Sequence, residues 1–222
     1  SEAEVVRHFT ALSRVNFSID THFYPLGSCT MKYNPKSCEA AAALPELTDV
    51  HPLWPQLLGG GLLTQGSLSI LYNLERLLSE VTGLDEFTLQ PMAGAHGELT
   101  GVTLMAAYHK DVGNDKDHII VPDSAHGTNP ASAQMCGMKV VVVNCDEDGN
   151  VDISDLKNKA EKYSKHLAAL MVTYPSTHGV FEEKIIEICE VIHKHGGQVY
   201  MDGANLNALV GIAKPGKFGP DV

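Results

Sequence analysis

The sequence lacks the features of membrane, secreted and nucleic-acid-binding proteins. No apolar run approaches the length of a membrane span, and the N-terminal residues do not have the basic-then-apolar form of a signal peptide. The five cysteines are odd in number, scattered and free of CxxC spacing, so reduced thiols in a cytoplasmic protein are expected. A net charge of −11 argues against a general nucleic-acid or anionic-membrane binder.

Several well-known site motifs are also missing. The eleven histidines include no pair in the HExxH arrangement, so no metal site is expected. The glycine loop at residues 94–97 matches neither GxGxxG nor GxxxxGK[ST], which argues against a dinucleotide or a nucleoside triphosphate.

The chain has 222 residues and is 44% hydrophobic, enough for one large α/β domain or a domain with an appendage. Residues 1–60 are rich in proline, glycine and turn residues, and they are interpreted as an irregular N-terminal arm laid over another surface. Residues 61–222 have regular patterns and are expected to form the large domain.

Strands and helices are expected to alternate in this domain. A helix is expected from Thr64, with apolar residues at helical spacing up to Val81 and a stop at Gly83. Apolar strands follow at residues 86–91, 118–123, 139–146, 167–176 and 198–204, with helices between them. The last of these helices is expected to turn Phe181, Ile185, Ile188 and Ile192 inward. Apolar strands without polar alternation, separated by helices, predict a mostly parallel sheet that is covered by helices on both faces. Ligands of such sheets lie beyond the C-terminal ends of the strands.

Small polar residues follow these strands. Gly94 and Gly97 open a helix whose unpaired N–H groups and dipole suit a phosphate, although a tight strand-to-helix turn uses the same residues. His126 lies between small residues, so its ring could stack on a flat aromatic ligand or shuttle a proton, or it could belong to a helix-capping turn.

Asp202 follows a buried strand and has no basic neighbour in sequence before Lys214. A buried carboxylate needs a partner, and a protonated pyridine nitrogen would provide one. The alternative is a structural aspartate that caps the turn at Asn205. A phosphate loop, a stacking histidine and this aspartate on one sheet together indicate pyridoxal 5'-phosphate.

Five stretches of the sequence are distinctive: YPLGSCTMKYNP (24–35), GAHGE (94–98), SAHGTNPASA (124–133), TYPSTHGVFEE (173–183) and HGGQVYMDGANLNA (195–208). Together they closely resemble the glycine decarboxylase P-protein family, the pyridoxal-phosphate component of the glycine cleavage system. The resemblance runs over essentially the whole chain. The chain is similar to the C-terminal half of the P-protein, or to subunit 2 of the split bacterial enzyme. This resemblance implies a type I pyridoxal-phosphate-dependent transferase fold, with an incomplete large domain and an extended arm.

The resemblance also implies an activity and its partners. The family decarboxylates glycine and transfers the aminomethyl group to the lipoyl-bearing H-protein, so glycine, H-protein and a companion P-protein subunit in a homo- or hetero-oligomer are expected partners. By motif, His126 and Asp202 are the catalytic candidates. The residues expected near the cofactor are Ala93, Gly94, Ala95, His96, His126, Thr173, Asp202 and Ala204. Ser28, Cys29 and Thr30 are expected on the substrate side, with Lys32 as a candidate anion contact.

One departure from the family pattern concerns the Schiff-base lysine. The family places it in an H-x-N-x-H-K segment shortly after a sequence like Gly219–Val222, and that segment does not occur here. Lys214 and Lys217 lie in a Pro/Gly-rich loop and are not taken as substitutes. The chain is therefore expected to be truncated, to bind the cofactor weakly and non-covalently at best, and to catalyse no glycine decarboxylation by itself. Another type I enzyme, such as an aminotransferase, and a non-catalytic assembly subunit remain as alternatives.

Overall fold

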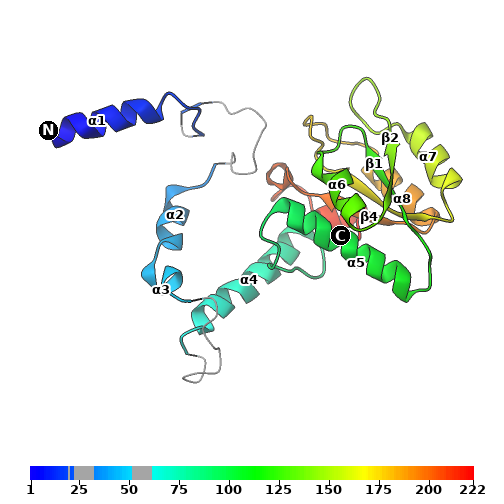
Figure 1. Ribbon diagram of the computed structural model, residues 1–222, viewed down its shortest axis with the longest axis horizontal. Coiled ribbons are helices and arrows are strands. Elements are labelled where there is room, and N and C mark those ends of the chain that lie inside the picture. The colour runs from blue at the N-terminus through cyan, green and yellow to red at the C-terminus, as the bar shows by residue number, and fades with distance from the viewer. Residues whose placement is uncertain (20, 23–32, 52–61) are drawn as a thin grey trace. The chain divides into compact units, whose positions relative to one another are not determined.

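The computed structural model describes residues 1–19, 21–22, 33–51 and 62–222, and it forms two compact units, Ser1–Ser69 and Ile70–Val222 (Figure 1). Ser28, Cys29, Thr30 and Lys32 lie outside the described residues, so their expected place on the substrate side stays a prediction. The boundary expected at residue 60 stays a prediction too. In the described part of the chain, no helix is long and apolar enough to cross a membrane.

The first unit contains more regular structure than the composition suggests. Its helices are α1 (Glu2–Ser13), α2 (Lys36–Ala42) and α3 (Pro45–Thr48). The Ser1 hydroxyl accepts from the Glu4 N–H while the Glu4 carboxylate binds back to the amino terminus, a capping box. The expectation of an irregular segment is therefore wrong for these ranges, and the S-x-x-E spacing was the signal for α1.

The second unit is built on a parallel sheet, as expected. Its strands are β1 (His118–Pro122), β2 (Lys139–Val143), β3 (Leu167–Thr173) and β4 (Gln198–Asp202), in the order β2-β1-β3-β4. The strand expected at 86–91 is wrong. Its side chains alternate between half-buried and exposed, but the segment joins no sheet ladder, and the Gln90 N–H donates locally to Thr88 Oγ1 at 3.3 Å.

The helices fall close to their expected positions. They are α4 (Gln65–Thr82), α5 (Gly94–Asp111), α6 (Thr128–Met135), α7 (Ile153–Lys162) and α8 (Ile185–Lys194), with short 3-10 turns at Leu206–Ala208 and Pro215–Phe218. Gly83 follows α4 with φ +77°, which glycine adopts without strain. Phe181 is a correction, because it precedes α8 and is 51% exposed, whereas Ile185, Ile188 and Ile192 are buried as expected.

Helices cover both faces of the sheet (Figure 1). Successive strand residues point to opposite faces, so β1 sends Ile119 toward the α5–α6 face and Ile120 toward the α7–α8 face. All seven residues of β3 are buried, as expected for an inner strand covered on both sides. Two dry apolar layers therefore support the strand ends.

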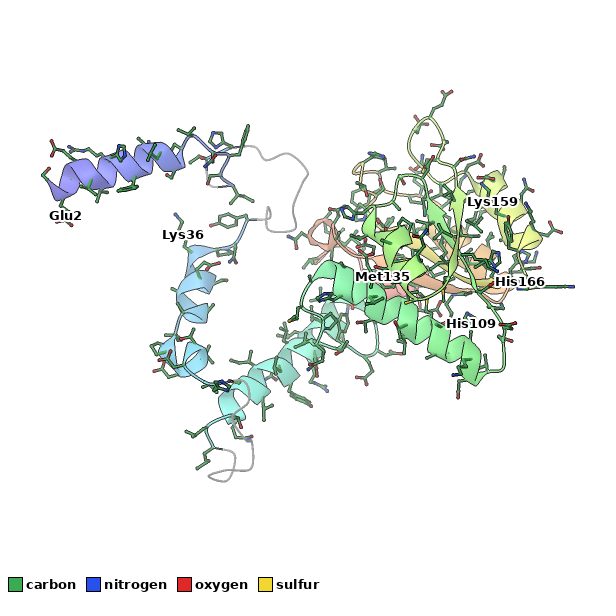
Figure 2. The ribbon with its side chains drawn as sticks, in the orientation of Figure 1. Glu2, Lys36, His109, Met135, Lys159 and His166 are labelled. Atoms are coloured by element: carbon green, nitrogen blue, oxygen red, sulfur yellow. The ribbon has the colours of Figure 1, made fainter. Side chains whose placement is uncertain are left out.

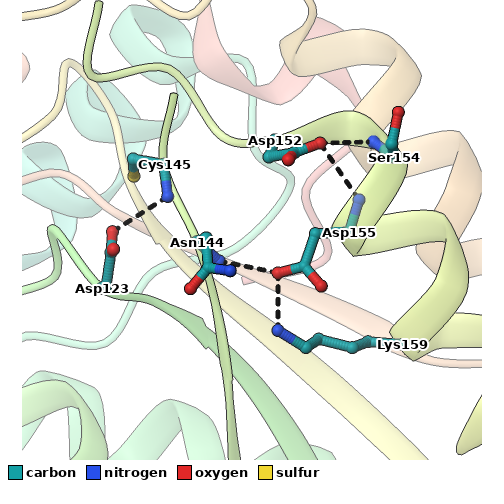
Figure 3. Close-up of polar contacts among 7 residues, drawn as sticks. All are labelled: Asp123, Asn144, Cys145, Asp152, Ser154, Asp155 and Lys159. Carbon is teal, nitrogen blue, oxygen red and sulfur yellow. Dashed lines mark hydrogen bonds and ion pairs between the residues drawn. The ribbon is translucent and has the colours of Figure 1, made fainter. Parts of the chain in front are cut away.

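The connection from β2 to α7 is fixed by carboxylates (Figure 3). Asp152 is the N-cap of α7, and its Oδ1 accepts from the N–H groups of Ser154 and Asp155 at 2.8 and 3.1 Å. Asp155 Oδ2 accepts from the Asn144 N–H at 2.9 Å and pairs with Lys159 Nζ at 2.5 Å. These bonds explain why the chain leaves β2 and enters a helix here.

Gly101 lets α5 lie close to β4. A Cβ atom at this position would lie 2.4 Å from Cε2 of the Tyr200 ring and 3.0 Å from Val222 Cγ1. Val222 also pairs with the edge of β4, since its N–H donates to Val199 O at 3.1 Å and its carbonyl accepts from the Met201 N–H at 2.7 Å.

We expect Gly101→Ala to lower the free energy of unfolding by roughly 1–3 kcal/mol, because the methyl group overpacks against Tyr200. Gly66→Ala in α4 is the matched control, since its Cβ would meet nothing within 4 Å. It should raise stability by up to about 1 kcal/mol through helix propensity. Denaturant unfolding measures both, and equal effects would contradict the close approach.

His109 joins α5 to the sheet (Figure 2). It is 2% exposed, its Nε2–H donates to Ala168 O at 2.7 Å, and its Nδ1 has no hydrogen-bond partner in the described part of the chain. Burial lowers the pKa of His109 below its ordinary value of 6.5. The ring is therefore neutral in the folded protein.

The unfolded chain binds a proton at His109 more readily than the folded protein does. The free energy of unfolding is therefore highest above the pKa of the unfolded chain, and it decreases as pH falls toward the lower pKa of the folded protein. We expect the stability advantage of the wild type over His109→Gln to shrink between about pH 8 and about pH 5.5. Chemical denaturation at each pH measures this. His178→Gln, at an exposed position, is the control, and a constant advantage would show that His109 is not the titrating group.

Candidate functional site

The strand order creates a crevice between the C-terminal ends of β1 and β3. The chain leaves β1 through α6 to reach β2 on one side, and leaves β3 through α8 to reach β4 on the other. Parallel sheets bind ligands at such a switch point. His126 follows β1, and Thr173 ends β3.

Asp202 ends β4 and is half-buried. Its Oδ2 accepts from Asn129 Nδ2 at 3.2 Å and from Thr173 Oγ1 at 3.5 Å, and its Oδ1 accepts from the Ala204 N–H at 2.9 Å. The bond from the Ala204 N–H is the contact expected if Asp202 caps the turn that follows β4. Among the described residues, no ion pair involves Asp202.

Asn129 connects α6 to this carboxylate. It is 0% exposed, and its Oδ1 has no hydrogen-bond partner among the described atoms. A buried, unpaired amide oxygen costs free energy and is uncommon in folded proteins. A hydrogen-bond acceptor, Asn129 Oδ1, is therefore unsatisfied by the described residues beside Asp202.

His126 is exposed, just before α6. Its Nδ1 lies 2.8 Å from Thr128 Oγ1 and 3.3 Å from the Thr128 N–H, so the capping contact also occurs. Thr128 Oγ1 is in turn 2.7 Å from Oε1 of Glu98, a buried residue of α5. The histidine is therefore tied through one hydroxyl to the adjacent helix.

The N-terminus of α5 lies one turn before Glu98. Ala93 is its extended N-cap and makes no side-chain capping bond. The exposed residues Gly94, Ala95 and His96 form the first turn, and a Cβ on Gly94 would meet nothing within 4 Å. An uncapped first turn of an 18-residue helix presents N–H groups and positive potential to an anion.

The remaining predicted residue, Ala204, is exposed in the turn after β4. Asn205 beside it donates from Nδ2 to Pro175 O at 3.1 Å and Ser176 O at 3.2 Å, which joins the loops after β3 and β4. Hydrogen bonds thus link His126, through α6, to Asp202, Thr173 and Ala204. Ala93–His96 precede Glu98 on the helix bonded to this group.

Glu98, Thr128 and Asn129 were not singled out by sequence reasoning. All three lie inside quoted motifs, GAHGE and SAHGTNPASA, but their roles depend on contacts between α5, α6 and β4. The available sequence signal for Glu98 was its position one helical turn after the glycine loop.

A different polar group lies at the opposite end of β1. Ligand atoms of Asp117, His118 and His166 lie within 4.8 Å of one another. Asp117 Oδ2 is already paired with Lys139 Nζ at 2.7 Å, and this ion pair lowers the pKa of Asp117. The arrangement is that of an ion-pair network, and the absence of a metal site stays a prediction.

Comparisons with known proteins agree on the relationship. The family model described as "Glycine cleavage system P-protein" matches residues 62–222. Glycine dehydrogenase (decarboxylating) of Stenotrophomonas maltophilia is 54% identical over the whole chain, which covers 23% of that protein. Probable glycine dehydrogenase (decarboxylating) subunit 2 of Nitrosomonas eutropha is 52% identical, again over the whole chain, which covers 44% of it. The chain thus spans less than half the length of these relatives.

Solved structures support the fold. Glycine decarboxylase (P-protein) of the glycine cleavage system, in inhibitor-bound form, superposes over the whole chain and 47% of its own length, with a TM-score of 0.71 and 19% identity. Oryza sativa TDC with PLP and tryptamine superposes over 63% of this chain and 33% of its own, with a TM-score of 0.52 and 11% identity. The parallel sheet is that of the type I pyridoxal-phosphate-dependent fold, and the chain belongs to the glycine cleavage system P-protein family.

Proposed function

We propose that this chain forms part of the pyridoxal-phosphate site of a glycine dehydrogenase that decarboxylates glycine. The observation that carries the proposal is Asp202, a half-buried carboxylate held by Asn129 and Thr173, which makes no ion pair with any described residue. Identity of 54% to a protein named glycine dehydrogenase (decarboxylating) supports the reaction. The same relatives disfavour an aminotransferase or a non-catalytic subunit.

The residues present fit pyridoxal 5'-phosphate. Its pyridinium would satisfy Asp202, and its phosphate suits the uncapped first turn of α5 at Ala93–His96. The exposed ring of His126 would stack on the pyridine, while Thr173 and Ala204 border the ring beside Asp202. When bound, the cofactor supplies an electron sink for the electrons released on loss of carbon dioxide.

The chain's own residues have defined tasks in this proposal. Asp202 would hold a proton on the ring nitrogen, and the side chains of Asn129 and Thr173, which donate to its Oδ2, restrict the rotation of the carboxylate. His126 restricts the tilt of the ring and excludes water from one face. The turn at Asn205, bonded to Pro175 and Ser176, keeps the loops around the ring in place.

No described lysine of this chain is proposed as the Schiff-base amine. Lys214, the first lysine after Asp202 along the chain, has its Nζ 2.6 Å from Glu80 Oε1. We propose that the amine comes from the family's H-x-N-x-H-K segment, and that Ser28, Cys29 and Thr30 border the substrate.

The proposed partners follow from the family and its relatives. They are glycine, the lipoyl H-protein and a companion subunit, the last supported by the name "subunit 2" of one relative. A cytoplasmic location is proposed from the scattered cysteines.

We expect Asp202→Asn in the complete enzyme to weaken cofactor binding about 10–100-fold, because a charge-assisted hydrogen bond is lost. Turnover of glycine should fall about 100-fold or more, because the ring nitrogen loses its proton. Absorption titration and carbon dioxide release measure the two effects.

Asp148→Asn is the matched control, since Asp148 is exposed in the loop after β2. Unchanged cofactor affinity and turnover in Asp202→Asn would overturn the assignment.

A further inference from the structure

Glu98 is a buried carboxylate whose role is not explained by the residues assigned so far. It is 5% exposed, and its described partners are both hydroxyls of α6: Thr128 Oγ1 at 2.7 Å from Oε1, and Ser132 Oγ at 3.3 Å from Oε2. A carboxylate in such a place is costly unless hydrogen bonds hold it. The two hydroxyls provide that stabilisation.

The hydrogen-bond inventory of Thr128 decides the direction of these bonds. A hydroxyl has one proton, and the Thr128 hydroxyl donates it to Glu98 Oε1. The same oxygen lies 2.8 Å from His126 Nδ1 and has only lone pairs left for it. A hydrogen bond at this distance therefore requires a proton on Nδ1, donated to Thr128.

A competing contact defines the alternative state. The Thr128 N–H lies 3.3 Å from the same Nδ1, and it can donate only when Nδ1 carries no proton. The ring would then carry its proton on Nε2. Because the two states exclude each other, the shorter bond to the hydroxyl selects between them.

We propose that Glu98 is a positioning residue which, through Thr128, holds neutral His126 in the tautomer with the proton on Nδ1 and fixes the plane of its ring. The value of this for stacking on a cofactor rests on the proposed function. The next residue, Asn129, orients Asp202, so the first turn of α6 sets both partners of the pyridine ring.

The test uses the full chain labelled with 15N-histidine at about pH 8.5, where the 15N shifts of the two ring nitrogens distinguish the neutral tautomers. His126→Gln identifies the His126 resonances. We expect Nδ1 in the wild type to resonate in the protonated range. In Thr128→Val, which removes the hydroxyl at nearly constant volume, Nδ1 should move to the unprotonated range because the backbone N–H replaces the lost partner.

Glu98→Leu should produce the same change, because the Thr128 hydroxyl is then free to donate to Nδ1. Thr128→Ser retains the hydroxyl and should keep the wild-type tautomer. Ser132→Ala is the matched control, since it removes a Glu98 partner that does not contact His126. If Glu98→Leu does not fold, Glu98→Met, which is closer to glutamate in length and also lacks the carboxylate, makes the same test.

An unchanged Nδ1 resonance in Thr128→Val would overturn the proposal, and so would an equal change in Ser132→Ala. Titration with pyridoxal phosphate is a separate measurement, in which Thr128→Val should bind about three to ten times more weakly. A switched tautomer with unchanged affinity would sustain the role of Glu98 and count against the stacking of His126 in the proposed function.

Discussion

The hydrogen bonding of Asp202 is the constraint on which the site depends. A carboxylate at the end of a parallel strand must be satisfied by donors, and these come from three elements: α6 through Asn129, β3 through Thr173, and the following turn through Ala204. The donors converge only if β3 and β4 keep their register, in which Thr173 lies opposite Asp202. The register is in turn fixed by apolar layers on both faces of the sheet. The packing of the core therefore determines the geometry of the site.

The first turn of α6 connects the remaining parts. Thr128 and Asn129 are consecutive, yet the first side chain bonds to Glu98 on α5 and the second to Asp202 on β4. A shift of α6 along its axis would disturb both bonds. A buried anchor opposes such a shift, since Ala133 packs in the apolar layer. His126 lies just before the N-terminus of this helix and contacts it through Thr128, so a shift of α6 would also move the partner of the histidine ring.

Sequence patterns predicted the parts of this structure that depend on local chemistry. Apolar runs located β1 to β4, and helical spacing located α4 and α8, because each pattern reports the face that the element buries. The prediction of a strand at residues 86–91 was wrong, because an alternation of apolar and polar residues indicates an extended chain but does not provide a partner strand. Among candidate site residues, His126 and Asp202 could be found because strand ends meet at one edge. Glu98 and Asn129 could not, because their burial and partners arise from the packing of α5 and α6.

The site also illustrates how function is set against stability. Within residues 1–19, 21–22, 33–51 and 62–222, Asn129 Oδ1 is buried without a hydrogen-bond partner, Asp202 makes no ion pair, and the first turn of α5 has no side-chain cap. Each feature is a cost that a purely structural sequence would remove with a lysine, a second donor or a capping serine. They occur at the C-terminal end of the sheet, whereas all seven residues of β3 are buried. A ligand with a cationic ring and a phosphate offsets two of these costs at once. Its binding would therefore stabilise the fold at the place where the chain alone is least satisfied.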